Sequence, residues 1–333
     1  MEPDSEFSVD VGSLPESVRN GTLPHCGHCS RKESSESDIK LKRCNGCHAA
    51  VYCSKECQKA AWPGHRDTCH SVRSLKREDA PESYAGYDTP VVLINAIKAW
   101  LQKQHDTFRF LARATVLMSC NVEQVFATPE PSRFLVIQIA PGTHPTAENW
   151  NPGNAFRFVG GSITEKTVAR SVMPLSDERW NEWMTGCRRK GERYRQSAPS
   201  ESSLPFLGTI PTIVIVNPFL ITMLDSFHIH GLRYPHRVPT PLDQKSRPAF
   251  DDIVNMCTWS VDEGCVLRHP TGRDGSVFTP DVGVYVRKGK NWKWEPLKDF
   301  NWAAYTRYRF VNLSNGKITC MEPELTWGLY YNL

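Results

Sequence analysis

Seven of the chain's twelve cysteines lie between Cys26 and Cys69, and their spacing is the strongest constraint on how this chain folds. With one histidine they form four pairs: Cys26/Cys29, Cys44/Cys47, Cys53/Cys57 and His65/Cys69. The first two pairs enclose a glycine, which accepts the backbone angles that aim two thiolates at one ion. The last two are spaced i, i+4, so a helical turn places both donors on one face. Eight donors in four pairs predict two closed, four-coordinate structural zinc sites.

The same segment is poor in side chains that could form a core. Between residues 24 and 69 the large apolar residues are only Ile39, Leu41, Val51, Tyr52 and Trp62. Burying so few side chains cannot offset the entropy of ordering the segment. Structural zinc in finger peptides contributes about 10–16 kcal/mol, which closes that gap. We therefore expect Zn²⁺, two ions per chain, to be the cofactor.

Spacing alone leaves two questions open, namely which pairs share an ion and whether other histidines compete. A sequential arrangement joins the first pair to the second, and an interleaved one joins the first to the third and the second to the fourth. Four more histidines lie close enough in sequence to act as ligands: His25, His28, His48 and His70.

The run CSKECQKAAWPGHRDTC at 53–69, preceded by two CxxC pairs, resembles the MYND-type zinc finger at every ligand position. The resemblance implies an interleaved arrangement. One zinc would take Cys26, Cys29, Cys53 and Cys57, and the other would take Cys44, Cys47, His65 and Cys69. The stretch between Cys29 and Cys44 is longer than the family pattern, and its Ser, Glu and Lys content predicts a solvated loop.

Charge bears on what such a finger binds. Residues 24–69 contain eight Lys/Arg and five Asp/Glu, and seven thiolates with two Zn²⁺ bring the total near neutral. A reader of duplex DNA shows a clear basic surplus, so we expect no duplex nucleic acid as partner. The family resemblance implies instead a protein partner or a short proline-containing peptide. Trp62 would offer an aromatic wall and Gln58 a hydrogen bond to peptide backbone. The alternative, that Trp62 belongs to the finger's small core, stays open.

The rest of the chain predicts an α+β fold class, with the finger joined to a larger domain of helices followed by a strand-rich part. The predicted organisation is a disordered segment at 1–23, the finger at 24–69, a linker at 70–88 and an α+β domain at 89–333. Thr89 and Pro90 form a helix start, and the apolar periodicity predicts one long or two consecutive helices over 90–119. Further helices are expected at 176–190 and 248–259. Strands are expected at 134–140 and 212–216, with a hairpin at 282–294 that turns at 289–291.

Two segments raise the question of cellular location. Residues 204–224 carry no charge, but Pro205, Pro211 and Pro218 interrupt them at intervals typical of strand and turn, so we expect no membrane partner. The start of the sequence does not resemble a secretory signal, so we expect an intracellular protein, cytoplasmic or nuclear. The basic run RRKGERYR at 188–195 is typical of a solvated helix end. The alternative is a nuclear-localisation or anion-binding patch.

Catalytic motifs are sparse. His228 and His230 would point the same way from a strand, with Asp225 and His236 nearby, which is a metal-ligand pattern. Some MYND proteins are lysine methyltransferases with a SET domain, whose cofactor motif contains Asn-His, a dipeptide absent from this chain.

The sequence therefore predicts a non-enzymatic zinc-binding interaction module fused to an α+β domain. One alternative is an enzyme with a metal site around His228 and His230 that uses the finger for docking. A further alternative is a transcriptional regulator acting through protein partners.

Overall fold

The structure, a computed structural model, describes seventeen stretches of the chain. They are residues 26–29, 31, 39–47, 50–74, 87, 90–127, 131–142, 151–173, 175–197, 204–217, 221–232, 240–244, 246–270, 279–289, 291–298, 300–302 and 322–332. The predicted disordered segment at 1–23 and His236 lie outside these residues. Contacts divide the chain into two compact units, Met1–Gln102 with Gly142–Ala155, and Lys103–Pro141 with Phe156–Leu333. The predicted domain limits stay a prediction.

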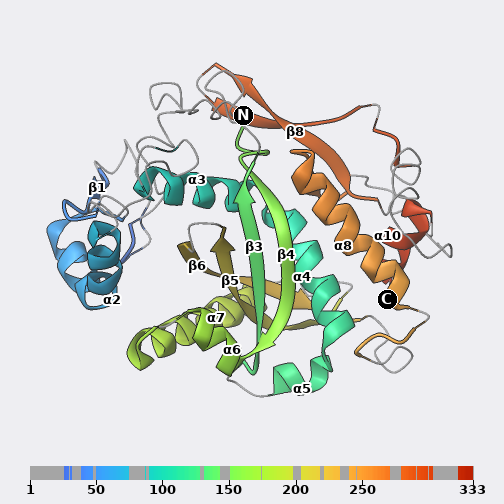
Figure 1. Cartoon of the computed structure of the whole chain (residues 1–333), viewed down its shortest axis with the longest axis horizontal. Coiled ribbons are helices and arrows are strands. Elements are labelled where there is room, and N and C mark those ends of the chain that lie inside the picture. The colour runs from blue at the N-terminus through green and yellow to red at the C-terminus, as the bar shows by residue number, and fades with distance from the viewer. Residues whose placement is uncertain are drawn as a thin grey trace, which may run out of the picture. The chain divides into compact units, whose positions relative to one another are not determined.

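The first unit contains the cysteine-rich segment. Strands β1 (Lys42–Arg43) and β2 (Val51–Tyr52) form an antiparallel pair, and helix α2 (Lys55–Ser74) follows (Figure 1). The Ser54 hydroxyl accepts a hydrogen bond from the Cys57 amide at 3.2 Å, as an N-cap residue does. The helix continues past Cys69 to Ser74, so its last turn occupies residues for which the composition predicts a linker.

The expected helix start at Pro90 is present. Helix α3 (Pro90–Lys103) begins there and buries Leu93, Ile97 and Trp100 completely. The Trp100 indole donates a hydrogen bond to the Gly153 carbonyl at 3.2 Å, within the first unit. A turn at Gln104 separates α3 from α4 (His105–Ser119), so the predicted helical region consists of two consecutive helices.

A mixed four-stranded sheet forms the centre of the second unit, in the order β4-β3-β5-β6. Its strands are β3 (Arg133–Pro141), β4 (Phe156–Glu165), β5 (Phe206–Val216) and β6 (Ile221–His230). Strand β3 pairs antiparallel with β4 and parallel with β5, and β5 pairs antiparallel with β6. The uncharged segment at 204–224 thus forms β5 and the start of β6. No helix in the described stretches is long and apolar enough to span a membrane.

Both faces of this sheet are covered by helices. Consecutive residues Phe134, Leu135, Val136 and Ile137 are buried, a pattern typical of strands covered on two sides. On one face Phe134 and Ile213 pack with residues of α6 (Lys166–Val172) and α7 (Asp177–Ser197). Helix α4 and helix α8 (Arg247–Asp262) contact β6 and β4, and Figure 1 shows them on the other side.

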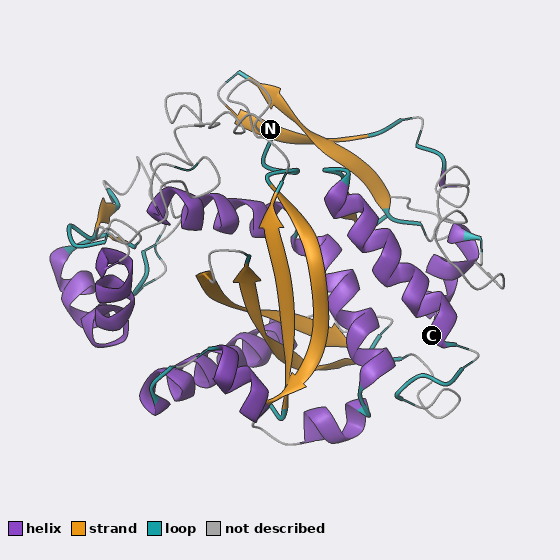
Figure 2. Cartoon of the chain, in the orientation of Figure 1, coloured by secondary structure: helices purple, strands orange, loops and turns teal. Residues whose placement is uncertain are grey.

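Two short helices and a small antiparallel sheet also belong to the second unit (Figure 2). Helix α5 (Val122–Ala127) contacts β5, and helix α10 (Pro323–Asn332) contacts α8. Strands β7 (Val266–Arg268), β8 (Asp281–Lys288) and β9 (Asn291–Pro296) form an antiparallel sheet. Gly289 adopts φ +62°, and Lys288 pairs with Asn291. The turn is therefore one residue shorter than predicted, because Asn291 already belongs to β9. The predicted α+β fold class is confirmed.

We expect the cluster between the sheet and α7 to dominate the stability of the second unit. The Trp180 ring is fully buried and lies 5.2 Å from the Phe134 ring, centroid to centroid. Changing Trp180→Ala should lower the free energy of unfolding by about 3–5 kcal/mol, because it leaves a large cavity. Urea unfolding would measure the loss. The control Val168→Ala, at a half-exposed position, should change stability by less than about 0.5 kcal/mol. Equal losses in both variants would contradict this assignment of the core.

Candidate functional site

Eight donor residues meet in two groups of four within the first unit. One group is Cys26, Cys29, Cys53 and Cys57, and the other is Cys44, Cys47, His65 and Cys69. In each group one donor atom per residue lies within 4.8 Å of the others. The structure therefore has the interleaved arrangement, first pair with third and second pair with fourth. Of the four additional histidines, His28 and His70 belong to neither group, and His25 and His48 lie outside the described residues.

The donor spacings fit tetrahedral zinc. Sulfurs bound at 2.3 Å to one tetrahedral ion lie about 3.8 Å apart. The Sγ–Sγ distance is 3.5 Å from Cys53 to both Cys29 and Cys57, and 3.8 Å from Cys44 to Cys69. The Cys47 Sγ lies 3.4 Å from His65 Nε2. The two groups are zinc sites with four protein donors each, which leaves no open position for a substrate.

Electrostatics also favours a cation in the second group. Burial raises the pKa of the Cys69 thiol to about 12, and the neighbouring Cys47 and Cys44 add to the rise. Thiolates this close repel each other unless a positive ion lies between them. Zn²⁺ removes the conflict because it binds the deprotonated thiols directly.

Short backbone elements place the donors. The Cys44 amide donates to the Ala50 carbonyl at 2.8 Å, which closes the loop between β1 and β2. Helix α2 supplies Cys57 to one group, and it supplies His65 and Cys69, which are four residues apart and share a face, to the other. One helix therefore carries donors to both zinc ions.

The finger's apolar core is small and consists largely of the ligands. Cys26, Cys44, Cys47 and Cys69 cluster with Tyr52, and the partly buried neighbours include Leu41, Ala61 and Ile94. Five residues of this cluster are buried and four of them are metal-binding cysteines. This matches the expectation that metal coordination rather than apolar burial stabilises the segment.

Gln58 and Trp62 lie four residues apart on α2, next to the donor face. Trp62 is 39% exposed and lies outside the core cluster, with its ring 6.0 Å from that of His65 and 6.3 Å from that of His70. The alternative in which Trp62 forms the core therefore does not describe the structure. The Gln58 Nε2 lies 3.7 Å from the Cys44 Sγ, as a donor to that sulfur. Their peptide-binding role stays a prediction.

The residues of the alternative enzyme site are engaged within the second unit. His228 Nδ1 lies 3.1 Å from the Thr209 hydroxyl, and His230 Nε2 lies 3.1 Å from the Tyr194 hydroxyl. Asp225 pairs with Lys190 at 3.6 Å. Within the described stretches no third metal donor joins the two histidines, so the structure gives no support to the metal site of the enzyme alternative. They contact aromatic and hydroxyl groups instead.

The basic run at 188–195 lies on α7. Lys190 donates to the Ser226 carbonyl at 2.9 Å, and the Arg195 guanidinium lies 5.3 Å from the centre of the Phe206 ring. These contacts favour a structural role for part of the run.

Comparisons with known proteins identify the finger. Residues 26–69 match the family model of the MYND finger. Mouse histone-lysine N-methyltransferase SMYD3 is 50% identical over 44 residues, which are 13% of this chain and 10% of that protein. MYND-type zinc finger protein samB of Aspergillus clavatus is 39% identical over 52 residues, 16% of this chain and 9% of that protein.

A third relative is the SET domain and MYND-type zinc finger protein 6 of Schizosaccharomyces pombe. It is 36% identical over 69 residues, 21% of this chain and 13% of that protein. This chain thus covers about a tenth of each relative's length. No solved structure gives a significant match. The predicted MYND-type finger and its two zinc ions are confirmed.

Loss of metal should unfold the finger and leave the second unit folded. Structural zinc contributes about 10–16 kcal/mol, and the finger's cluster has few apolar side chains to replace it. Chelation should abolish the hydrogen-exchange protection of α2 while the amides of β3 and β5 keep theirs. By elemental analysis, Cys47→Ser should lower the zinc content from two ions per chain to one, and the control His70→Ala should retain both. Protection of α2 that survives chelation would overturn this account.

The half-buried His228 makes the second unit sensitive to acid. Burial, with the nearby charge of Lys190, lowers the pKa of His228 to about 4, whereas an unfolded histidine has a pKa of about 6.5. Between these values the unfolded chain binds more protons than the folded one. Stability is therefore complete above pH 6.5 and falls as the pH drops toward 4.

Hydrogen exchange of the β5 and β6 amides across this pH range, in excess zinc, would measure the effect. His228→Gln should flatten the pH dependence, whereas Val168→Ala should keep it. An unchanged slope in His228→Gln would show that other groups cause the acid sensitivity.

Proposed function

We propose that the finger is a protein-interaction module that binds short proline-containing segments of partner proteins through Gln58 and Trp62. The observation that carries the proposal is the partial exposure of Trp62 beside the metal sites. The Trp62 side chain is large, aromatic and 39% exposed, and the helix that carries it is held in place by the metal sites. A proline ring can pack against such a surface.

Zinc coordination makes this face rigid before a partner arrives. The same helix carries donors of both zinc ions, so the direction of Gln58 and Trp62 is set by metal bonds. A surface held in its binding geometry loses little conformational entropy on association. The proposal therefore requires metal for binding, although neither zinc contacts the partner.

The backbone beside Trp62 offers a further acceptor. Pro63 lies inside α2 and has no N–H group, so the Lys59 carbonyl lacks the helical donor that it would find four residues later. Gln58 uses an amide hydrogen toward Cys44, which leaves its carbonyl oxygen as an acceptor for an extended peptide. A peptide backbone N–H can use either acceptor while a proline ring packs on the indole.

The relatives do not extend this proposal to methyl transfer. SMYD3, the relative named as a methyltransferase, matches this chain over only 44 residues, which are 13% of its length. Absence of catalysis in the second unit stays a prediction.

A peptide array probed with the full-length, zinc-loaded chain tests the proposal. It would carry short proline-containing peptides, each beside a copy with alanine in place of proline. Binding to the proline members should fall at least about fivefold with Trp62→Ala and more weakly with Gln58→Ala, since truncating an aromatic anchor costs more than about 1 kcal/mol.

The matched control Lys42→Ala, an exposed finger residue on β1, should bind as wild type does. Zinc content must stay at two ions in all variants. Equal binding of the alanine copies, or full binding by Trp62→Ala, would refute the proposal.

A further inference from the structure

The second unit contains a cavity of about 260 Å³ whose wall is basic and aromatic. It contains two arginines, three histidines, three tyrosines, one phenylalanine and one leucine, and no carboxylate. The side chains come from α4, α7, β6, α10, the residue after β7 and Leu204, which precedes β5. Neither the zinc finger nor its proposed partner involves this cavity.

The positive charge that a ligand can use belongs to Arg109. Arg113 is buried and donates to the backbone carbonyls of His230, Gly231 and Tyr330, so its guanidinium is already occupied in holding β6 and α10. Among the described residues, the Arg109 guanidinium makes one long contact, 3.4 Å to Asp106, and its side chain is one quarter exposed. Asp106 does not line the cavity. The planar fork of Arg109 suits a carboxylate, which it can bind with two parallel hydrogen bonds.

The histidines act here as neutral groups. Desolvation lowers the pKa of both His228 and His269 to about 4, so both rings are uncharged near pH 7. Each uses Nδ1 for a contact, His228 with the Thr209 hydroxyl at 3.1 Å and His269 with the Tyr331 hydroxyl at 3.3 Å. Among the described residues neither Nε2 has a hydrogen-bond partner. These two histidines thus give the cavity wall polar groups without adding charge.

Aromatic rings form much of the remaining wall. The Phe110 ring lies 4.9 Å from that of His269 and 6.3 Å from that of Tyr331, and Tyr194 stacks on His228 at 4.2 Å. Flat apolar surfaces of this kind favour a flat ligand. The volume exceeds the ~150 Å³ cavity that holds benzene and lies just below the ~300–1,000 Å³ of sites for drug-sized ligands. A single ring with one acidic group fits these limits.

We propose that this cavity binds a small aromatic carboxylate, with the carboxylate on Arg109 and the ring against the aromatic wall. His269 and Tyr331 supply further polar contacts to the acid group. A doubly charged phosphate fits less well, because only one guanidinium is available and Asp106 lies beside it.

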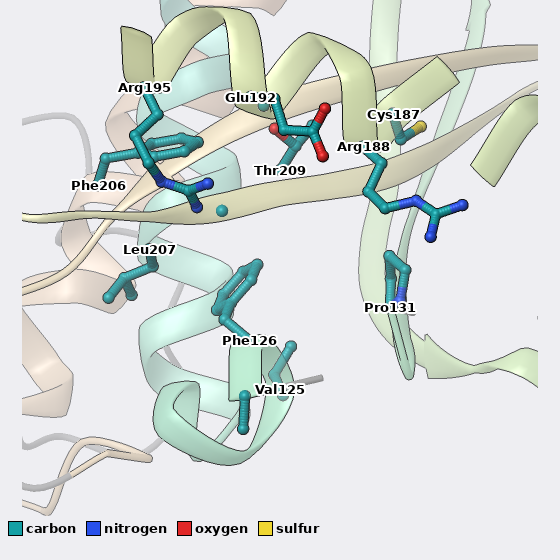
Figure 3. A pocket seen from close by; sticks show the side chains of 13 residues that line it. Val125, Phe126, Pro131, Cys187, Arg188, Glu192, Arg195, Phe206, Leu207 and Thr209 are labelled. Atoms are coloured by element: carbon teal, nitrogen blue, oxygen red, sulfur yellow. The ribbon is translucent and has the colours of Figure 1, made fainter. Parts of the chain in front are cut away.

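A second cavity of similar size shows by contrast why the first is favoured. This space of about 250 Å³ lies between α7, α5 and β5 (Figure 3). Its wall includes Arg188 and Arg195, but Glu192 lies on the same helix between them, and Figure 3 shows Arg195 beside Phe206. The positive charge there is partly compensated within the wall. It provides a matched control, Arg188, which is an arginine lining a different cavity of the same unit.

Calorimetric titration of the full-length, zinc-loaded chain with benzoate tests the proposal. The neutral isostere benzamide and the dianion phenyl phosphate are the comparison ligands. A ligand of this size should bind with a Kd of about 1 mM or tighter. Benzoate should bind at least tenfold more tightly than benzamide, because only the carboxylate offers Arg109 two acceptor oxygens and a negative charge. Tighter binding of phenyl phosphate would overturn the carboxylate assignment.

Variants locate the binding site. Arg109→Gln should weaken benzoate binding at least about tenfold, and Tyr331→Phe, which removes only a hydroxyl group, about threefold to tenfold. Arg188→Gln should bind as wild type does. Thermal unfolding of each variant would show that the second unit is intact, and Tyr331→Phe covers the case in which Arg109→Gln does not fold. Undetectable benzoate binding by the wild type, or unchanged binding in both cavity variants, would refute the proposal.

Discussion

Metal–thiolate coordination is the interaction on which the first part of this structure depends. The finger's buried cluster consists almost entirely of its own ligands, with Tyr52 as the one large side chain among them. Helix α2 carries donors of both metal sites, so the ions fix its position directly. Because Gln58 and Trp62 lie on the adjacent face of that helix, the proposed peptide surface is held rigid by the zinc sites rather than by apolar packing.

The second unit is stabilised differently. Its central strands β3 and β5 are largely buried, and α4, α6, α7 and α8 supply the apolar cover of the sheet. A buried guanidinium, that of Arg113, joins the end of β6 to α10 through backbone carbonyls. These elements come from distant parts of the chain, and their meeting creates the basic aromatic cavity. The proposed peptide surface depends on zinc, whereas the cavity of the second unit does not. Partner binding and ligand binding can therefore be tested separately.

Much of the finger was predictable because its chemistry is local. Paired donors at short spacing constrain the backbone strongly, and glycine in the two CxxC turns removes the steric cost. The helix start at Pro90 and the strands at 134–140 and 212–216 were also predictable from the sequence. Helix capping and runs of β-branched residues determine local structure within a few residues. The hairpin turn was predicted one residue too long, because strand pairing between Lys288 and Asn291 decides where β9 begins.

The sequence by itself determined that this chain binds two zinc ions in one short segment, since ligand type and spacing leave few other uses for eight such residues. Which two donor pairs bind the same zinc ion was implied only by the family resemblance, and the folded chain shows the interleaved arrangement. Only tertiary structure decided that His228 and His230 lie among Tyr194, Thr209 and Arg113 instead of beside a third metal donor. It also brought Arg109, His269 and Tyr331 together, because contacts across more than a hundred residues leave no periodic trace in the sequence.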